Sequence, residues 1–416
     1  MSHDYKKAYR TIMDDHFPEK MEIAFIEGDR RQVLRYEKVS WVVDEVRKGL
    51  RYGENPGQEA ALFRLVEGQV ALGEVTTIGP GLALASGMEM IQQGKHPGKI
   101  NITDVDGALN ILRYLMDKPC VVIVKHNNPC GVATGGTIGE AYRRAFMADR
   151  IAAFGGAIVL NRPVDRATAE AIHEQYAEVV AAPEYEAGAL DALARSKNLR
   201  IMRIDAIRRL QEWAPRRFVD LTCLIDGGII AQVSFVPEAR TKAQLRLAEV
   251  KAADVVHRIQ REPTEAEVRD MLFGWMVEAG VTSNSVIYVK DECTVGIGTG
   301  EQDRVGVAEI ARDKAYRKLA DRISWERLGT PFNDLRDEAK RRDIEEEVKE
   351  KRGGLTGCVM VSDAFFPFRD GVDVGLREGV RAVIQPGGSV RDHEVIDACN
   401  EVNATMVFTG QRSFKH

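Results

Sequence analysis

A lysine and a histidine stand side by side at the end of an apolar run, and they are the residues of this sequence best suited to chemistry. The run 121–124 (Val-Val-Ile-Val) is followed by Lys125, by His126 and by the turn formers of 127–131. This pattern predicts a buried strand that ends in a turn. Histidine can move a proton near neutral pH, and the neighbouring lysine can stabilise developing negative charge. Open α/β sheets bind ligands at such strand ends, although a solvated strand end is the plain alternative.

Four further segments could bind a ligand, and each also has an ordinary structural interpretation. Arg51 and Tyr52 lie in a turn rich in Gly, Asn and Pro. Their side chains could bind a phosphate, and the alternative is an ordinary surface turn. Alternate glycines in 295–300 precede an expected helix, without the spacing of a nucleotide-binding loop. The phenylalanines of 365–368 could form a wall for a flat heterocycle or pack in the core. Residues 385–389 (Gln-Pro-Gly-Gly-Ser) predict an anion nest or a helix cap.

Strand-like and helix-like segments alternate along the chain, which predicts an α/β layered fold. Thr264 and Glu267 form a capping-box pattern at the start of one helix. The charged stretch 333–352 has a thin apolar stripe, so we expect a solvated helix there; a partner-binding helix is the alternative.

The expected helices are 104–116 (capped by Asp104), 137–148, 165–177, 185–195, one from Thr264, 305–318 and 391–401. The expected strands are 120–125, 152–160, 178–182, 199–204, 285–289, 358–361, 380–384 and 404–408. The segment near 120 also echoes the one near 358, which hints at two related halves.

The composition is that of a soluble globular protein. The chain has 416 residues, of which 44% are hydrophobic and 29% are charged, and a net charge of −5. This charge offers no general attraction to nucleic acid or to an anionic membrane, and no apolar run is long enough to span a bilayer. No apolar core follows the charged N-terminus, so we do not expect it to be a secretory signal. Six scattered cysteines without a CxxC pair favour a reducing cytoplasm.

The order of the segments resembles that of the AICAR transformylase family, from about Arg51 to His416. The matching segments are RYGENPGQ, KHNNPCGVA, AAFGGAIVLNRPVD, SNSVIYV, GIGTGEQDRV, SDAFFPFRDGVD, IQPGGSVRD and a terminal Arg-x-Phe. The resemblance implies transfer of the formyl group of 10-formyltetrahydrofolate to the 5-amino group of 5-aminoimidazole-4-carboxamide ribonucleotide (AICAR). It also implies two cytidine-deaminase-like α/β units in tandem, which we expect at 1–205 and 206–416. A charged helical insert at about 320–355 is expected to pack on the first unit.

The resemblance assigns roles to particular residues. It implies that His126 is the general base at the amine, that Lys125 stabilises the formyl oxygen or assists the leaving nitrogen, and that Asn284 is an oxyanion or carboxamide partner. Arg304 is implied to hold the carboxamide, Phe365 to face the imidazole, and Arg51, Tyr52 and Arg412 to bind chiefly the phosphate. Further nucleotide contacts are implied for Asn101, Phe154, Gly155 and Glu178, and folate contacts for Val305, Pro367, Asp370, Gly371 and Ser389. Gly57 and Gly371 depart from the residues common in the family.

The resemblance also implies the partners of the chain. It implies a homodimer with active sites at the subunit interface and no redox cofactor or catalytic metal. Only 50 residues precede Arg51, so we expect no cyclohydrolase domain and no ring closure, and a separate IMP cyclohydrolase is expected to complete the pathway. The alternatives are a zinc-dependent deaminase and a non-catalytic nucleotide-binding relative. The first needs H-x-E and P-C-x-x-C ligands, but Ala133 stands where the second cysteine would be.

Overall fold

Short apolar strands form the centre of the fold. In the computed structural model, which describes residues 8–76 and 82–416, β11 (Ala157–Leu160), β12 (Val179–Ala182) and β22 (Ala382–Gln385) are buried over their whole length. Strands that are buried on both faces are typical of a sheet covered by helices. The predicted α/β class is therefore confirmed.

The chain divides into two compact units. Unit 1 comprises Met1–Pro119, Val124–Asn127 and Gly155–Val236, and unit 2 comprises Cys120–Ile123, Asn128–Phe154 and Pro237–His416. The division passes through β9 (Cys120–Lys125), so this strand belongs to both units. None of the described helices is long and apolar enough to cross a bilayer.

Unit 1 combines an α/β layer with several hairpins. Its central strands have the order β9-β11-β12-β13-β8, in which β11, β12 and β13 are parallel and β8 is antiparallel. The other elements of this layer are β8 (Glu89–Gln92), α2 (Lys99–Leu112), α5 (Arg166–His173), α6 (Ala189–Ala194) and β13 (Arg200–Arg203). The hairpins and short helices are β1 (Lys20–Glu27), β2 (Arg30–Lys38), β3 (Trp41–Val43), β4 (Val46–Lys48), β5 (Phe63–Gly68), β6 (Ala71–Leu72), β7 (Val75–Thr76), η1 (Ala85–Gly87), η2 (Asp205–Trp213), β14 (Val219–Cys223) and β15 (Ile229–Val233).

Unit 2 contains a longer run of strands in the order β16-β23-β22-β21-β19-β20-β10-β9. Strands β21, β22 and β23 are parallel, and β19 and β20 form an antiparallel hairpin. Its strands are β10 (Asn128–Thr134), β16 (Arg246–Leu247), β17 (Glu249–Ala252), β18 (Val255–Arg258), β19 (Val286–Lys290), β20 (Cys293–Gly298), β21 (Val359–Ser362) and β23 (Thr405–Phe408). Its helices are α3 (Ile138–Ala148), α4 (Arg150–Ala153), η3 (Lys242–Gln244), α7 (Glu265–Glu278), α8 (Arg304–Leu328), η4 (Phe332–Asp334), α9 (Glu338–Glu350), η5 (Arg352–Gly354), α10 (Arg369–Arg377) and α11 (Asp392–Glu401).

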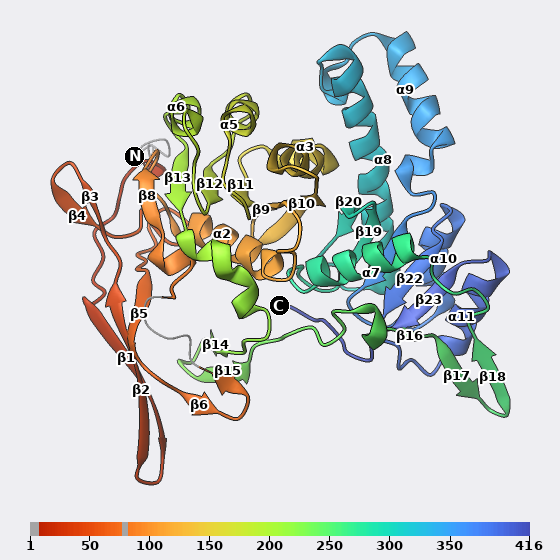
Figure 1. Ribbon diagram of the computed structural model, residues 1–416, viewed down its shortest axis with the longest axis horizontal. Coiled ribbons are helices and arrows are strands. Elements are labelled where there is room, and N and C mark those ends of the chain that lie inside the picture. The colour runs from red at the N-terminus through yellow and green to blue at the C-terminus, as the bar shows by residue number, and fades with distance from the viewer. Residues whose placement is uncertain (1–7, 77–81) are drawn as a thin grey trace. The chain divides into compact units, whose positions relative to one another are not determined.

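The same order of elements occurs twice along the chain (Figure 1). In each run a helix leads to two neighbouring strands joined by a two-residue turn, and then helices and strands alternate. Apart from α4 in the first run and η4, α9 and η5 in the second, the first run is α2, β9, β10, α3, β11, α5, β12, α6 and β13, and the second is α7, β19, β20, α8, β21, α10, β22, α11 and β23. This repetition is what two tandem units of one fold require. It pairs β9 with β19, so the expected correspondence between the segments near 120 and near 358 is wrong.

The compact units do not coincide with the expected domains 1–205 and 206–416. Strand β10 and helices α3 and α4 lie in unit 2, where β10 pairs with β20, and residues 206–236 lie in unit 1. Each of the two runs nevertheless falls inside one expected domain. The domain assignment therefore stays a prediction about two repeats.

Two predicted boundaries are wrong for identifiable reasons. The first helix begins at Lys99 instead of after Asp104, because the Asn101 side chain caps it by accepting a hydrogen bond from the Gly98 N–H at 3.0 Å. Asp104 instead lies inside α2 with 5% of its surface exposed. The turn expected at 127–131 is shorter, because β10 already begins at Asn128.

The alternate glycines form part of strand β20 rather than a ligand-binding loop. A Cβ atom on Gly298 would lie 2.2 Å from the Val307 carbonyl oxygen, and one on Gly296 would lie 2.3 Å from that of Ala311. Glycine is therefore required at both positions because the strand packs directly against the backbone of α8. Only Gly300, which follows the strand, has a positive φ of 70°.

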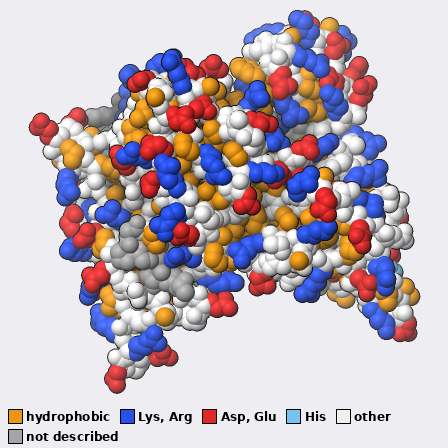
Figure 2. Space-filling view, in the orientation of Figure 1, with side chains coloured by type: hydrophobic (Ala, Val, Ile, Leu, Met, Phe, Trp, Pro, Cys, Tyr) orange, Lys and Arg blue, Asp and Glu red, His pale blue; other side chains and the backbone are white. Residues whose placement is uncertain are grey.

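The predicted capping box and the predicted charged helix are both present. Thr264 and Glu267 exchange the expected hydrogen bonds at the start of α7. The charged helix is α9, whose buried Ile344 and Val348 pack with Leu319 of α8. On the face shown in Figure 2, acidic and basic side chains are interspersed, as expected for a chain of small net charge.

Candidate functional site

The Lys125–His126 pair lies where β9 ends and a tight turn begins. Lys125 is the last residue of β9 and is half-buried, whereas His126 is exposed. His126 and Asn127 have left-handed φ values of 55° and 61°, and β10 starts at the next residue. Two successive positive φ values are typical of a type I′ turn, which joins neighbouring strands closely. The turn therefore presents the imidazole at the end of the strand.

A buried carboxylate from α2 holds this turn. The Asn127 N–H donates to Asp104 Oδ1 at 2.7 Å. Burial raises the pKa of the Asp104 carboxyl, while the amides of Asn127 and His126 and the charge of His126 act in the opposite direction. Sequence reasoning assigned Asp104 to a helix cap and missed this contact, which depends on the fold of α2 against β9.

Three polar side chains meet beside the start of α2. The Asn101 amide donates to Glu178 Oε2 at 3.0 Å, and the same oxygen lies 3.5 Å from Nη1 of Arg200. Arg200 is fully buried, and burial lowers the pKa of its guanidinium to about 10, with the charge of Arg51 acting in the same direction. Arg200 was not predicted as a site residue, because an arginine at the start of a strand has no distinctive pattern.

Arg51 and Tyr52 lie in the same region. The Arg51 side chain is 6% exposed, donates to the Lys95 carbonyl at 3.0 Å and stacks over the Tyr52 ring at 4.5 Å. Its Nε, like that of Arg200, is buried without a hydrogen-bond partner among the described residues. The nearby His96 has a pKa lowered by burial and by both arginines. Two buried guanidinium groups beside the single carboxylate of Glu178 leave an excess of positive charge, which suits an anion.

Unit 2 holds a second group around Arg304. Its Nη1 donates to Asp363 Oδ1 at 2.5 Å and to the Ser285 carbonyl at 3.0 Å, and its Nη2 donates to Asn284 Oδ1 at 3.0 Å. The Asn284 amide donates in turn to the Gln302 carbonyl at 3.0 Å. The structure therefore brings together two predicted site residues, Asn284 and Arg304, in one direct hydrogen bond.

A second buried acid lies behind this group. Glu278 is fully buried, and its Oε1 accepts a hydrogen bond from Ser285 Oγ at 2.5 Å. Burial raises the pKa of the Glu278 carboxyl well above its usual value, and the negative charge of Asp363 raises it further. Because Asp363 already pairs with Arg304, a protonated Glu278 leaves the cluster electrically balanced. Sequence reasoning missed Glu278, which directly follows the apolar run 271–277 at the end of α7.

The predicted folate residues surround the ends of β21 and β22. Pro367 and Asp370 are exposed at the start of α10, and a Cβ on Gly371 would lie 3.3 Å from Arg304 Cγ. Val305 follows Arg304 on α8 and is half-buried. Ser389 lies before α11, where the Asp392 carboxylate accepts its N–H at 3.0 Å. Since β21 and β22 are parallel, both loops leave the same edge of the sheet.

Phenylalanines and the C-terminal tail complete the unit 2 group. Phe366 is fully buried, as the core interpretation predicts, whereas Phe365 is 38% exposed and its contact with the imidazole stays a prediction. The tail is held in place because the Ser413 N–H donates to the Asp363 carbonyl at 2.9 Å and Ser283 pairs with Lys415. Arg412 is exposed and stacks on the Phe414 ring at 4.2 Å.

The predicted residues thus form two groups, each inside one unit. Phe154 is 60% exposed at the end of α4, and Gly155 has a φ of 77° and donates its N–H to the Tyr176 carbonyl at 2.8 Å. The unit 1 group is Arg51, Tyr52, Asn101, Lys125, His126, Gly155 and Glu178. The unit 2 group is Phe154, Asn284, Arg304, Val305, Phe365, Pro367, Asp370, Gly371, Ser389 and Arg412. The first group offers a proton-moving imidazole, an ammonium and an anion site, and the second offers an amide, a guanidinium and an exposed ring.

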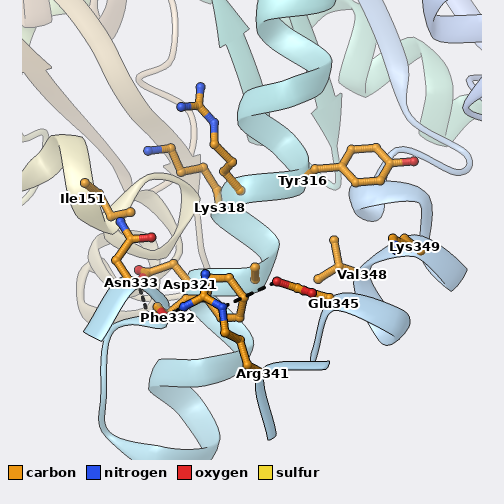
Figure 3. A pocket seen from close by; sticks show the side chains of 12 residues that line it. Ile151, Tyr316, Lys318, Asp321, Phe332, Asn333, Arg341, Glu345, Val348 and Lys349 are labelled. Atoms are coloured by element: carbon orange, nitrogen blue, oxygen red, sulfur yellow. Dashed lines mark hydrogen bonds and ion pairs between the residues drawn. The ribbon is translucent and has the colours of Figure 1, made fainter. Parts of the chain in front are cut away.

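A separate pocket of about 470 Å³ lies between α4, α8 and α9 (Figure 3). Ile151, Tyr316 and Val348 line it together with charged side chains, and Arg341 stacks on Phe332 at 4.5 Å. None of the predicted site residues lines this pocket. Within 8–76 and 82–416, no group of three or more His, Cys, Asp or Glu side chains is placed to hold a metal ion.

Comparison with known proteins identifies the family. The model of the AICARFT/IMPCHase bienzyme family matches residues 4–314. A bifunctional purine biosynthesis protein PurH from Magnetococcus marinus is 40% identical over 370 residues, which are 89% of this chain and 59% of that protein. The PurH of Xanthomonas euvesicatoria is 39% identical over 88% of this chain and 58% of its own length, and that of Oceanobacillus iheyensis is 33% identical over 98% and 65%. The chain thus spans about three fifths of the length of these relatives, and it belongs to the AICARFT/IMPCHase bienzyme family.

Proposed function

We propose that this chain transfers the formyl group of 10-formyltetrahydrofolate to the 5-amino group of AICAR and yields the formamido nucleotide FAICAR. The observation that carries the proposal is the position of Lys125 and His126 at the end of β9 in a chain of this family. The names of the relatives, bifunctional purine biosynthesis proteins, agree with a role in purine synthesis.

The reaction is an acyl transfer that needs a base and a stabilised oxyanion. The amine nitrogen attacks the formyl carbon of the folate and forms a tetrahedral intermediate with a negative oxygen. His126 takes the proton that the amine loses, and Lys125 stabilises the oxyanion. The bond from the carbon to folate N10 then breaks, and N10 receives a proton. The step requires neither a change of oxidation state nor a catalytic metal.

The two groups of residues supply the binding contacts in this proposal. Arg51 and Tyr52 bind the phosphate, with buried Arg200 adding positive charge. Arg304 and Asn284 hold the carboxamide of AICAR. Their hydrogen bond keeps the two side chains together, so one carboxamide can contact both. The remaining nucleotide contacts are assigned to Asn101, Phe154, Gly155, Glu178, Phe365 and Arg412, and the folate contacts to Val305, Pro367, Asp370, Gly371 and Ser389.

We also propose a homodimer whose sites take residues from both subunits, acting in the cytoplasm. None of the six cysteines, all of them among the described residues, is in a disulfide bond, which suits a reducing compartment. The proposal covers formyl transfer and not ring closure to IMP, because the matched relatives are longer than this chain. The assay for formyl transfer therefore follows IMP as well as FAICAR.

The deciding experiment is a formyl-transfer assay with the purified protein. AICAR is supplied with 10-formyltetrahydrofolate or, separately, with formate and ATP, and tetrahydrofolate, FAICAR and IMP are followed. Turnover with the folate donor supports the proposal. Absence of turnover with both donors contradicts it, and ammonia release together with stoichiometric zinc would favour the deaminase alternative. AICAR binding without any turnover would favour a non-catalytic relative.

Substitution of the proposed base links the activity to the site. His126→Ala is expected to lower kcat by about 10²- to 10⁴-fold, because the amine loses its proton acceptor. His173→Ala is the matched control, since His173 lies on α5, pairs with Ser196 Oγ at 2.8 Å and has no part in the proposed site. If His126→Ala retains the wild-type kcat in steady-state assays, the assigned role of the imidazole is wrong.

A further inference from the structure

We propose that Asp104 is a positioning residue that holds His126 in its working conformation and faces the imidazolium formed during transfer. The inference rests on the proposed function, since it assigns Asp104 a part in that reaction. It is carried by the contact between the carboxylate and the turn that bears His126.

The turn gains from an external partner because its sequence is not the one most favourable for its shape. Two-residue turns with both φ values positive prefer Asn-Gly or a similar pair, but His126 and Asn127 occupy this one. Left-handed backbone is costly for residues with a Cβ, and such strain persists only where the surroundings enforce it. The 2.7 Å hydrogen bond from the Asn127 N–H to the buried Asp104 carboxylate supplies that enforcement.

The same carboxylate also interacts electrostatically with the residue that gains charge in the reaction. A positive His126 stabilises the Asp104 anion, so the two groups interact electrostatically, and Glu178 adds a second negative charge nearby. When His126 accepts the proton of the amine, its imidazolium therefore meets a buried, oriented carboxylate. A carboxylate that orients a histidine and stabilises its cation is an established catalytic arrangement.

The second run of the chain contains the same contact between a buried helix aspartate and a two-residue turn, but its turn carries no histidine. Asp270 is the sixth residue of α7, as Asp104 is of α2, and both are buried. Asp270 accepts the N–H groups of Asp291 and Glu292 at 2.9 and 2.6 Å. That turn has φ values of 54° and 53°, but it joins β19 to β20 and carries only acidic side chains. The contact is thus structural in both runs, and only the first run places a proton-moving group on the turn.

This pair of aspartates provides a matched experiment. Asp104→Asn and Asp270→Asn each keep an oxygen acceptor and remove one buried charge. We expect similar losses of thermal stability in both variants. Only Asp104→Asn should lower kcat, by about 10- to 100-fold with KM for AICAR changed less than about twofold, and it should move the acid limb of the pH–rate profile to lower pH. The limb moves in that direction because an imidazolium without its facing carboxylate loses its proton more readily.

Three outcomes decide the question. A wild-type kcat and an unmoved acid limb in Asp104→Asn, or an equal fall of kcat in both variants, would overturn the proposal. Adding Asn127→Gly to Asp104→Asn should recover part of the lost kcat, because glycine adopts the left-handed turn without support. This double variant also supplies folded protein if Asp104→Asn alone does not fold, and the comparison with Asp270→Asn is then made in it.

Failure of the proposed function would be recognised separately. In that case the wild-type protein shows no formyl transfer, and amide hydrogen exchange in the absence of substrate still tests the positioning. Asp104→Asn should speed exchange at Asn127 by at least tenfold and leave Glu292 unchanged, whereas Asp270→Asn should do the reverse. Unchanged exchange at Asn127 would overturn the structural half of the inference.

Discussion

At the scale of single residues, burial decides which charges this protein can carry. Glu278 is fully buried, and its Oε2 has no hydrogen-bond partner among the described residues. The neighbouring Asp363 is committed to Arg304 by a 2.5 Å contact. Burial removes water from the Glu278 carboxyl, and the charge of Asp363 is already neutralised by Arg304. An ionised Glu278 would add an uncompensated negative charge, which explains why its pKa is raised.

This raised pKa predicts a specific dependence of stability on pH. Between the ordinary value of 4.5 and its raised value, Glu278 binds a proton in the folded chain but not in the unfolded one. The free energy of unfolding should therefore fall as the pH rises through the raised pKa. Glu278→Gln should remove this fall and be more stable than the wild type at alkaline pH, with the difference shrinking at acid pH.

Urea unfolding at a series of pH values measures this effect. Glu350→Gln is the control, because Glu350 is exposed at the end of α9 and its substitution should leave the wild-type slope intact. Parallel pH profiles for Glu278→Gln and the wild type would show that Glu278 is ionised in the folded protein.

At the scale of elements, close packing of strand on helix shapes both runs. In the second run a Cβ on Gly296 of β20 would lie 2.3 Å from the Ala311 carbonyl oxygen of α8, and in the first run a Cβ on Gly131 of β10 would lie 2.0 Å from the Ala145 carbonyl oxygen of α3. The distance between a strand and its covering helix is thus set by glycine at the same place in each run.

Substitution of one such glycine should be costly. A Cβ at position 298 would lie 2.2 Å from the Val307 oxygen, so Gly298→Ala is expected to lower the free energy of unfolding by about 3 kcal/mol. Gly107→Ala in helix α2 is the control, because the nearest atom that a Cβ would meet, Cγ1 of Val124, is 4.0 Å away and alanine should stabilise the helix by about 0.5–1 kcal/mol. Chemical denaturation gives both values, and a Gly298→Ala protein as stable as the wild type would contradict this account of the packing.

Much at this scale could be predicted from the sequence, and the exceptions share a cause. The Thr264 cap of α7 and strand β9 are local patterns, so they were predicted well. The glycines of β20 were assigned to a loop because their partner, the α8 backbone, comes from a different segment. Asp104 looked like a cap for the same reason, since its partner is an amide 23 residues further along the chain.

The residues of the candidate site also differ in whether a local sequence pattern could predict them. Lys125 and His126 could be predicted because an abrupt change from apolar to polar residues marks the end of a strand. Arg200 could not, since it is one of 58 lysines and arginines and only the fold reveals that it is fully buried beside Glu178. The motif order was informative because it combined many segments, each ambiguous by itself.

At the scale of the whole molecule, the predicted site residues are split between two compact units. His126 lies with the anion site in unit 1, and Arg304 lies with Asn284 in unit 2. In the proposed function, formyl transfer to a single nucleotide uses both groups at once. In the proposed homodimer, one site could take the two groups from different chains or from the same chain, and these arrangements differ in a measurable way.

Complementation between two inactive variants separates these arrangements. His126→Ala and Arg304→Ala each inactivate a homodimer, because every site lacks one required group. If sites are shared between chains, a mixed dimer has one site with both defects and one intact site. Purification through one tag on each chain selects the mixed dimers, which should therefore show about half of the wild-type activity per dimer. If each site is built within one chain, every site in the mixture carries a defect and no activity returns. The measurement is the formyl-transfer rate of dimers purified through two different affinity tags, with tagged wild-type pairs as the reference.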